Sequence, residues 1–252
     1  MSFYDLEKTE RDKLVMQINT DIETDIRTNL RSHLLHYFSD EDTYIRKTSY
    51  LAIGKIYRAS PELRHLVIGI LNILAADSNP KIRQTSVNAA GEIGKWDFTV
   101  VKNFFDTGLF DEHHSVRNAV IGSMKKMGEK NPAPVIEWSK QYLHHTDKEI
   151  RREICHGIEL RGRTHPQDIL PLLRQLQFDK TKRVRWTLVH VIGQIAYKKG
   201  CLEKVMADIT TWENKDLVAD AIEEIIDVHY RYRNFSFYTQ DEARKYIKSL
   251  KA

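Results

Sequence analysis

The sequence predicts an all-α fold in which similar helix pairs stack into a right-handed solenoid of about six pairs. Five dipeptides of a β-branched apolar residue followed by arginine form a regular series, at intervals of 37, 34, 34 and 34 residues, and the chain has no β-rich runs. The five dipeptides are Ile45-Arg46, Ile82-Arg83, Val116-Arg117, Ile150-Arg151 and Val184-Arg185. Self-similarity at this period is typical of helical-repeat solenoids, which act through one long concave surface.

An aspartate accompanies the arginine in most repeats. Five residues before the apolar member stand Asp40, Asp77, Asp111 and Asp179. In the fourth repeat His145 takes this place, and Asp147 follows two residues later. We expect these aspartates to be caps or near-caps of the arginine helices. We also expect the repeated Asp and Arg to bond each other and the neighbouring turns, with ligand contact as the less favoured alternative.

Each repeat is predicted to contain an arginine helix and an outer helix. The arginine helix of the fifth repeat has apolar residues at helical spacing: Val184, Leu188, Val191, Ile192 and Ile195. Outer helices are expected at, for example, 134–143 and 168–176. We expect a single repeat domain over 1–252, with an N-terminal cap (1–38), five clear repeats (39–212), and a degenerate repeat and C-terminal cap (213–252) whose last helix is 240–250.

Composition excludes several classes of protein. The chain has 41% hydrophobic and 29% charged residues and a net charge of +4, a mild basic excess that is compatible with acidic partners. The first residues lack the apolar stretch of a secretory signal, and the longest apolar run, 66–76, is too short to span a bilayer. Two cysteines cannot supply a disulfide framework. We expect a cytoplasmic protein with no membrane partner.

Alignment of the arginine helices on their arginine separates a packing face from a polar stripe. The stripe lies one, five, eight or nine, and twelve residues after the arginine, on one side of a helix. It is mainly basic and carries glycines, which we expect to let a large partner approach the backbone. These glycines are Gly54, Gly91, Gly122 and Gly193.

Trp186 is out of pattern, because other repeats place Lys, Gln, Asn or Arg at this position. An aromatic ring beside guanidinium groups suits the bases and phosphates of a nucleic acid. The alternatives are that Trp186 folds back onto a neighbouring helix and that the basic stripe is simply solvated. The predicted nucleic-acid-binding residues are Lys95, Lys125, Arg152, His156, Arg163, Trp186, His190, Gln194 and Tyr197.

Other chemistry has weaker support in the sequence. The pairs His113-His114 and His144-His145 do not have zinc-site spacing, so we expect no metal site. No phosphate loop or nucleophile elbow is present, and no cofactor is expected. Cys155 falls on the packing face and is predicted to be core, and Trp96 is as well explained by a core position as by a functional one.

The stretch from Trp138 to Trp212 resembles the DNA alkylation repair family, the HEAT-like-repeat alkylpurine DNA glycosylases. The pieces that carry this resemblance are "EIRREICHGIELRGR" (149–163), "DILPLLRQLQFD" (168–179), "RVRWTLVHVIGQIAYKKG" (183–200) and Trp212. The resemblance implies a HEAT-like solenoid that binds duplex DNA in its concave groove. It also implies excision of cationic alkylated purines, in which a carboxylate stabilises the sugar cation.

Residue by residue, the family's arginines match Arg151, Arg152, Arg161 and Arg185. The family's aspartate falls on Gln194 and its glutamate on His156, so a catalytic carboxylate would have to be Glu159, Glu92 or Asp97. Glu159 is the preferred candidate, because it lies on the stripe between Arg152 and Arg163. The expected function is therefore DNA binding, with base excision open. The alternative is a non-catalytic HEAT-repeat scaffold that binds a protein partner through the same groove.

Overall fold

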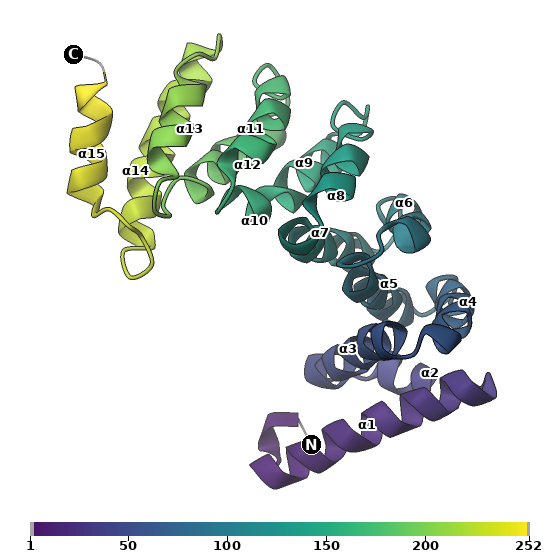
Figure 1. Cartoon of the computed structure of the whole chain (residues 1–252). Helices are drawn as coiled ribbons and strands as arrows, with labels where there is room; N and C mark the ends of the chain where they lie inside the picture. The colour runs from purple at the N-terminus through teal and green to yellow at the C-terminus, as the bar shows by residue number, and fades with distance from the viewer. Residues whose placement is uncertain (1–2, 251–252) are drawn as a thin grey trace. The chain divides into compact units, whose positions relative to one another are not determined.

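The computed structural model describes residues 3–250, which contain helices and no β-strand, so the predicted all-α fold is confirmed (Figure 1). The chain divides into two compact units, unit 1 (Met1–Asn131) and unit 2 (Pro132–Ala252). The single domain expected over 1–252 stays a prediction. The predicted caps include residues 1–2 and 251–252, which lie outside the described residues.

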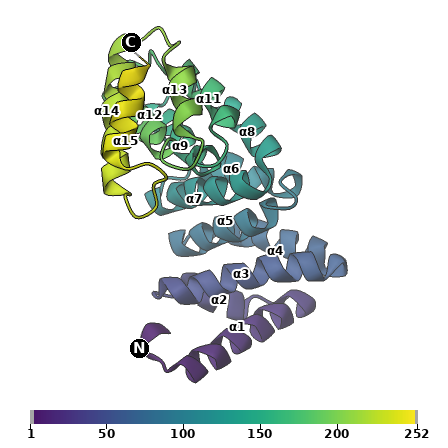
Figure 2. The same ribbon diagram turned by 60° about the vertical axis from the view of Figure 1, so that its left-hand side comes forward.

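Unit 1 contains the N-terminal helices and the first three arginine helices, α3, α5 and α7. Its elements are η1 (Phe3–Asp5), α1 (Lys8–Thr28), α2 (Ser32–Ser39), α3 (Thr43–Ala59), η2 (Pro61–Leu63), α4 (Arg64–Ala75), α5 (Pro80–Gly94), η3 (Thr99–Val101), α6 (Lys102–Gly108) and α7 (His114–Lys130). Helices α1, α3, α5 and α7 contact one another in this order, which Figure 2 shows as a stack. The unit is thus a helical-repeat solenoid with its arginine helices in one layer.

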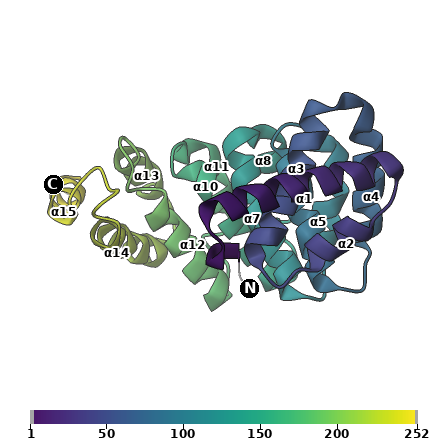
Figure 3. The same ribbon diagram turned by 90° about the horizontal axis from the view of Figure 1, so that it is seen from below.

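Unit 2 contains the last two arginine helices and the degenerate sixth repeat. Its helices are α8 (Pro132–Lys140), α9 (Lys148–Gly157), α10 (Glu159–Gly162), α11 (Pro166–Gln175), α12 (Lys182–Gln194), α13 (Leu202–Ile209), α14 (Lys215–Arg231) and α15 (Gln240–Ser249). Helices α9, α12 and α14 form the inner layer, and α11 and α13 contact each other in the outer layer, as Figure 3 shows for α11 to α14. Outer helices predicted at 134–143 and 168–176 begin two residues earlier, at Pro132 and Pro166.

The repeated aspartates are near-caps, as predicted. In each case a carboxylate oxygen accepts the N–H of the residue two positions on, and that residue is the N-cap of the arginine helix. The pairs are Asp40–Asp42 (2.7 Å), Asp77–Asn79 (2.8 Å), Asp111–His113 (2.8 Å) and Asp179–Thr181 (2.8 Å). In the fourth repeat the ring nitrogen Nδ1 of His145 accepts from Asp147 N at 3.0 Å. His145 therefore stabilises the same turn that an aspartate stabilises in the other repeats.

Two of the repeated arginines, Arg83 and Arg151, link the turn before their own helix to the turn of the next repeat. Arg83 donates to the carbonyl oxygens of Asp77 (2.9 Å) and Ser78 (3.0 Å) and to both carboxylate oxygens of Asp111 (2.8 and 2.9 Å). Burial opposes ionisation of Asp111, but its bonds to Arg83 and to the His113 N–H outweigh burial and lower its pKa. The structural role predicted for Asp and Arg is confirmed.

Two expectations about the arginine helices are wrong. The helix of the fourth repeat is not continuous over 149–163, because α9 ends at Gly157 and α10 begins at Glu159. Three of the four stripe glycines, Gly54, Gly91 and Gly193, leave no room for a partner, whereas a Cβ on Gly122 would meet no atom within 4 Å. A Cβ on Gly54 would lie 2.6 Å from the Glu92 Cβ, and one on Gly193 would lie 2.6 Å from the Glu224 Cγ. These glycines serve close packing between repeats.

Candidate functional site

The candidate site is an exposed surface on the inner layer of unit 2. Its residues, which we call the Trp186 surface, come from α9 and α12 and line a hollow of about 390 Å³: Arg152, His156, Arg183, Trp186, Thr187 and His190. A second hollow of about 420 Å³ also has Trp186 and His190 in its lining, together with Val189 and three residues of α14: Glu224, Asp227 and Arg231. The Trp186 and His190 side chains thus take part in both hollows.

Trp186 is 65% exposed, so the alternative that it folds back onto a neighbouring helix is wrong. The ammonium group of Lys182, one helical turn earlier, lies 5.2 Å from the ring centroid. This contact covers part of the ring and stabilises it as a cation–π pair. The rest of the indole is available to a partner.

The cations of the Trp186 surface are paired with carboxylates. Arg152 donates to Glu149 at 2.9 Å and to Glu153 at 3.3 Å. Arg183 lies 3.0 Å from the other oxygen of Glu149. These pairs leave less net positive charge at the surface than the sequence predicts from its basic residues.

The hollow between Trp186 and α14 is lined by acidic as well as basic side chains. Glu224 accepts a bond from Arg231, and Asp227 lies 2.6 Å from the same guanidinium. His190 Nδ1 lies 3.5 Å from Glu224 Oε1. The two hollows beside Trp186 are therefore lined by arginines on one side and by a mixture of two carboxylates and one arginine on the other.

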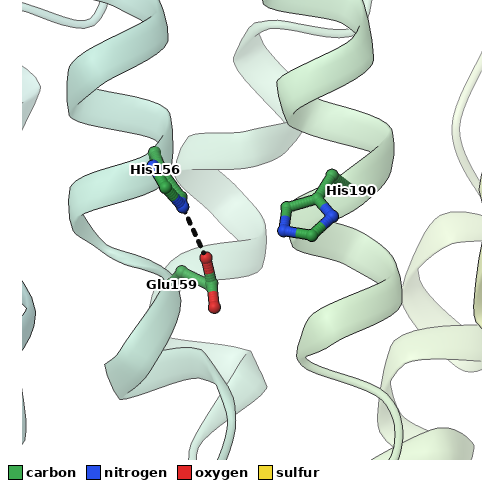
Figure 4. Close-up of side chains that lie close together, drawn as sticks. All are labelled: His156, Glu159 and His190. Carbon is green, nitrogen blue, oxygen red and sulfur yellow. Dashed lines mark ion pairs between the residues drawn. The ribbon is translucent and has the colours of Figure 1, made fainter. Parts of the chain in front are cut away.

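Beneath this surface lies a buried polar cluster. Glu159, 1% exposed, accepts from Arg163 Nε (3.0 Å) and Nη2 (2.5 Å) through one oxygen, Oε1. Its other oxygen, Oε2, lies 3.1 Å from His156 Nε2, as Figure 4 shows. Arg163 also donates to Gln194 Oε1 at 2.8 Å. Glu159 thus stands with both oxygens engaged.

The predicted binding residues fall into two groups. Arg152, His156, Trp186 and His190 lie together on the Trp186 surface, as predicted. The exposure expected from the stripe is wrong for Glu159, Gln194 and Tyr197, which are 1%, 0% and 4% exposed. The neighbouring inner helices cover the positions eight and nine residues after the arginine, and Tyr197 stacks on Tyr232 with 5.3 Å between ring centroids.

Two further predicted residues, Lys95 and Lys125, belong to unit 1. Lys95 forms a short ion pair with Glu92, and Lys126 lies 3.6 Å from the other oxygen of Glu92. Trp96 is 62% exposed, with the Arg58 guanidinium 5.3 Å from its ring centroid. The core position considered for Trp96 is therefore wrong.

Both cysteines are buried. Cys155 is fully buried, as predicted, and burial together with the nearby Glu159 carboxylate raises the pKa of its thiol. Burial also raises the pKa of Cys201. A thiol with a raised pKa is protonated at neutral pH and is a poor nucleophile.

The sequence missed one side-chain combination in this site. His156 and His190 both stand five residues after the arginine of their repeat, and the structure brings them together with Glu159. Metal-site spacing within one helix does not connect the two histidines, because they are 34 residues apart. The shared repeat position is the signal that could have found it.

No family model matches the sequence. Over 62 residues, 24% of this chain and 7% of the relative, the sequence is 39% identical to AP-1 complex subunit beta of Dictyostelium discoideum. A chain in the structure of the Pds5–Scc1 complex is similar over 89% of this chain and 36% of its own length, with 15% identity and a TM-score of 0.49. A chain in a complex of Kap95p with RanGDP has the same identity and TM-score over 84% of this chain and 31% of its own length.

The chain therefore spans a small part of the curated relative and about a third of these two solved chains. A computationally designed armadillo repeat protein is similar over 75% of this chain, with 15% identity and a TM-score of 0.32. Within residues 3–250, no helix combines the length and apolar character needed to cross a bilayer.

Proposed function

We propose that the chain is a non-catalytic HEAT-like repeat scaffold that binds a protein partner through the Trp186 surface. The observation that carries the proposal is the 65% exposed Trp186 with a hollow on either side. Tryptophan and arginine are enriched among the residues that dominate the free energy of protein–protein binding. An exposed indole with adjoining hollows fits an apolar side chain of a partner.

The charge pattern favours a protein over a nucleic acid. A phosphate backbone is bound by cations that are free to displace counterions. Here Arg152 and Arg183 share the carboxylate of Glu149, and the second hollow contains Glu224 and Asp227. A partner segment with an acidic group facing the arginines and a basic group facing Glu224 would complement both hollows.

The buried cluster around Glu159 supports a non-catalytic function for the chain. A carboxylate that stabilises a sugar cation must contact the substrate, but Glu159 is 1% exposed and is bonded to Arg163. The DNA reading, with Glu159 as catalytic carboxylate, remains the second candidate. Two arginines beside an exposed tryptophan favour it, because bases stack on such rings while phosphates bind the guanidinium groups.

Trp186→Ala tests the proposal, with Trp96→Ala as the matched control. Both tryptophans are about two-thirds exposed and each contacts one cation. Proteins retained by the immobilised chain from a lysate of the cells that make it are compared between the two variants. We expect Trp186→Ala to lose a specific retained protein that wild type and Trp96→Ala keep. Loss of the same proteins in both variants, or in neither, would contradict the proposal.

A further inference from the structure

We propose that His156, Glu159 and His190 form a binding site for a divalent transition-metal ion, with Zn²⁺ as the best-fitting ion. One ligand atom from each of the three side chains lies within 4.8 Å of the other two, a combination that occurs at this place among residues 3–250. Figure 4 shows the carboxylate of Glu159 below the His156 ring, with the His190 ring facing both from the neighbouring helix. The ligands come from consecutive repeats, α9 and α10 on one side and α12 on the other.

The distances are close to those of a tetrahedral site. Zinc binds histidine nitrogen and carboxylate oxygen at about 2.0–2.2 Å, which places tetrahedral ligand atoms about 3.4 Å apart. His156 Nε2 and Glu159 Oε2 are already 3.1 Å apart. The side chains of His156 and His190 are 33% and 41% exposed, so the rings can rotate to close the remaining gap.

Glu159 is oriented for binding by a residue outside the ligand set. Arg163 donates two bonds to Oε1, at 3.0 and 2.5 Å, and so holds the carboxylate with Oε2 turned toward His156. A bound cation would contact Oε2 while Arg163 keeps Oε1. A second carboxylate, Glu224, lies 3.5 Å from His190 and is itself paired with Arg231.

Glu224 also selects the ring nitrogen that His190 offers. Its Oε1 lies near Nδ1 of His190, and Figure 4 shows the other ring nitrogen directed toward Glu159. A carboxylate that accepts the Nδ1–H of a metal-binding histidine fixes the tautomer and makes the ligand more basic. Gly193 permits this arrangement, because any Cβ there would lie 2.6 Å from the Glu224 Cγ.

The ligand chemistry selects the class of ion. Two imidazole nitrogens and one carboxylate suit Zn²⁺ and its neighbours in the first transition row, whereas Mg²⁺ and Ca²⁺ prefer oxygen ligands. Three protein ligands leave a fourth position that can take water, and both histidines line a hollow of the Trp186 surface. A bound ion would tie the inner helices of two consecutive repeats together and so stabilise unit 2.

The test titrates Zn²⁺ alone, and Co²⁺ as a spectroscopic probe, into the full chain and its variants. His190→Gln and His156→Gln remove one ligand each at partly exposed positions. His144→Gln is the control, since His144 is an exposed histidine whose Nε2 lies 3.0 Å from Gln175 Oε1. Circular dichroism checks that each variant is folded.

We expect wild type and His144→Gln to bind one Zn²⁺ per chain and to give the visible absorption of four-coordinate Co²⁺. At about a hundredfold excess over Kd, Zn²⁺ should raise Tm by roughly 5 °C. Either ligand variant should lose at least about tenfold in affinity, the scale on which coordination partners contribute, together with the Co²⁺ bands. Two results would overturn the proposal. One is equal Zn²⁺ binding by all four proteins, which would show adventitious binding to surface histidines only. The other is no Zn²⁺ binding by wild type. Neither result bears on partner binding through Trp186.

Discussion

Arg151 and Asp179, 28 residues apart, join two consecutive repeats through a bidentate ion pair with N–O distances of 2.6 and 3.2 Å. The same guanidinium group donates to the carbonyl oxygens of His145 (2.7 Å) and Thr146 (2.9 Å), so one side chain closes the turn before its own helix and anchors the turn of the next. The side chains are 15% and 7% exposed. Arg83 and Asp111 repeat this arrangement in unit 1 at the same separation of 28 residues.

Arg151→Ala should lower the free energy of unfolding of unit 2 by about 3–5 kcal/mol, because it leaves the mostly buried Asp179 carboxylate without its partner. Arg27→Ala is the control. Arg27 forms an exposed pair with Glu23 one turn away, and its loss should cost less than about 1 kcal/mol. Urea unfolding followed by the fluorescence of the buried Trp138 and Trp212 measures the difference. Equal effects of the two substitutions would contradict the proposed role of the Arg151 pair.

Asp179 should make the stability of unit 2 sensitive to acid. Burial opposes its ionisation, but the bonds from Arg151 and the Thr181 N–H outweigh burial and lower its pKa in the folded chain. Its stabilising contribution is therefore complete above the unfolded pKa of about 3.9 and is lost as pH falls through the lower folded value. Asp179→Asn should flatten the fall in stability below about pH 4. Urea midpoints measured from pH 5 to pH 2.5 test this, and an unchanged slope would count against it.

Gly193→Ala and Gly69→Ala should have opposite effects on stability. A Cβ at Gly193 would lie 2.6 Å from the Glu224 Cγ and 3.3 Å from the Glu224 carbonyl oxygen, so overpacking should cost about 1–3 kcal/mol. A Cβ at Gly69, within α4, would meet no atom within 4 Å, and alanine should stabilise that helix by about 0.5–1 kcal/mol. Thermal unfolding of the two variants measures both signs. A stabilising Gly193→Ala would show that the inner helices are not closely packed there.

Glu159→Gln should destabilise unit 2 by about 3 kcal/mol, because Arg163 would lose its buried charged partner and keep Gln194. The control, Glu137→Gln, removes an exposed pair with Lys140 and should change stability by less than about 1 kcal/mol.

We expect the wild-type chain to release no methylated purine from alkylated DNA. If the wild-type chain releases methylated purines, and Glu159→Gln abolishes this release but still binds DNA, the chain is a glycosylase instead.

The repeat architecture could be predicted from the sequence because it depends on local periodicity. The arginine interval and the aspartate five residues earlier identified both the inner helices and the Asp–Arg contacts, such as Arg151–Asp179. The break between α9 and α10 could not be predicted, because nothing in 149–163 interrupts the apolar spacing. Exposure along the stripe also differs from the prediction. Whether a position such as Gln194 faces solvent depends on how closely the next inner helix packs, and Gly193 shows that this packing is tight.

The candidate site could be predicted in part. Trp186 was identified because it departs from the repeat pattern, and it is exposed as the stripe requires. Its electrostatic surroundings could not be predicted, because the carboxylates that pair with the cations of the Trp186 surface lie outside the stripe. Glu149, for example, engages both Arg152 and Arg183 from the first turn of α9. The contacts of His190 with Glu224 depend on the degenerate sixth repeat, whose register the sequence defines poorly.

Binding of random-sequence duplex DNA, measured over a series of salt concentrations, tests most directly whether the Trp186 surface is a protein-binding surface rather than a phosphate-binding one. Because its arginines are already paired with carboxylates, we predict a Kd weaker than about 10⁻⁴ M near physiological salt, outside the usual range of non-specific DNA binding. The double variant Arg152→Ala/Arg183→Ala should behave like wild type. Saturable micromolar binding that weakens steeply with salt, and whose salt dependence the double variant flattens, would contradict the account.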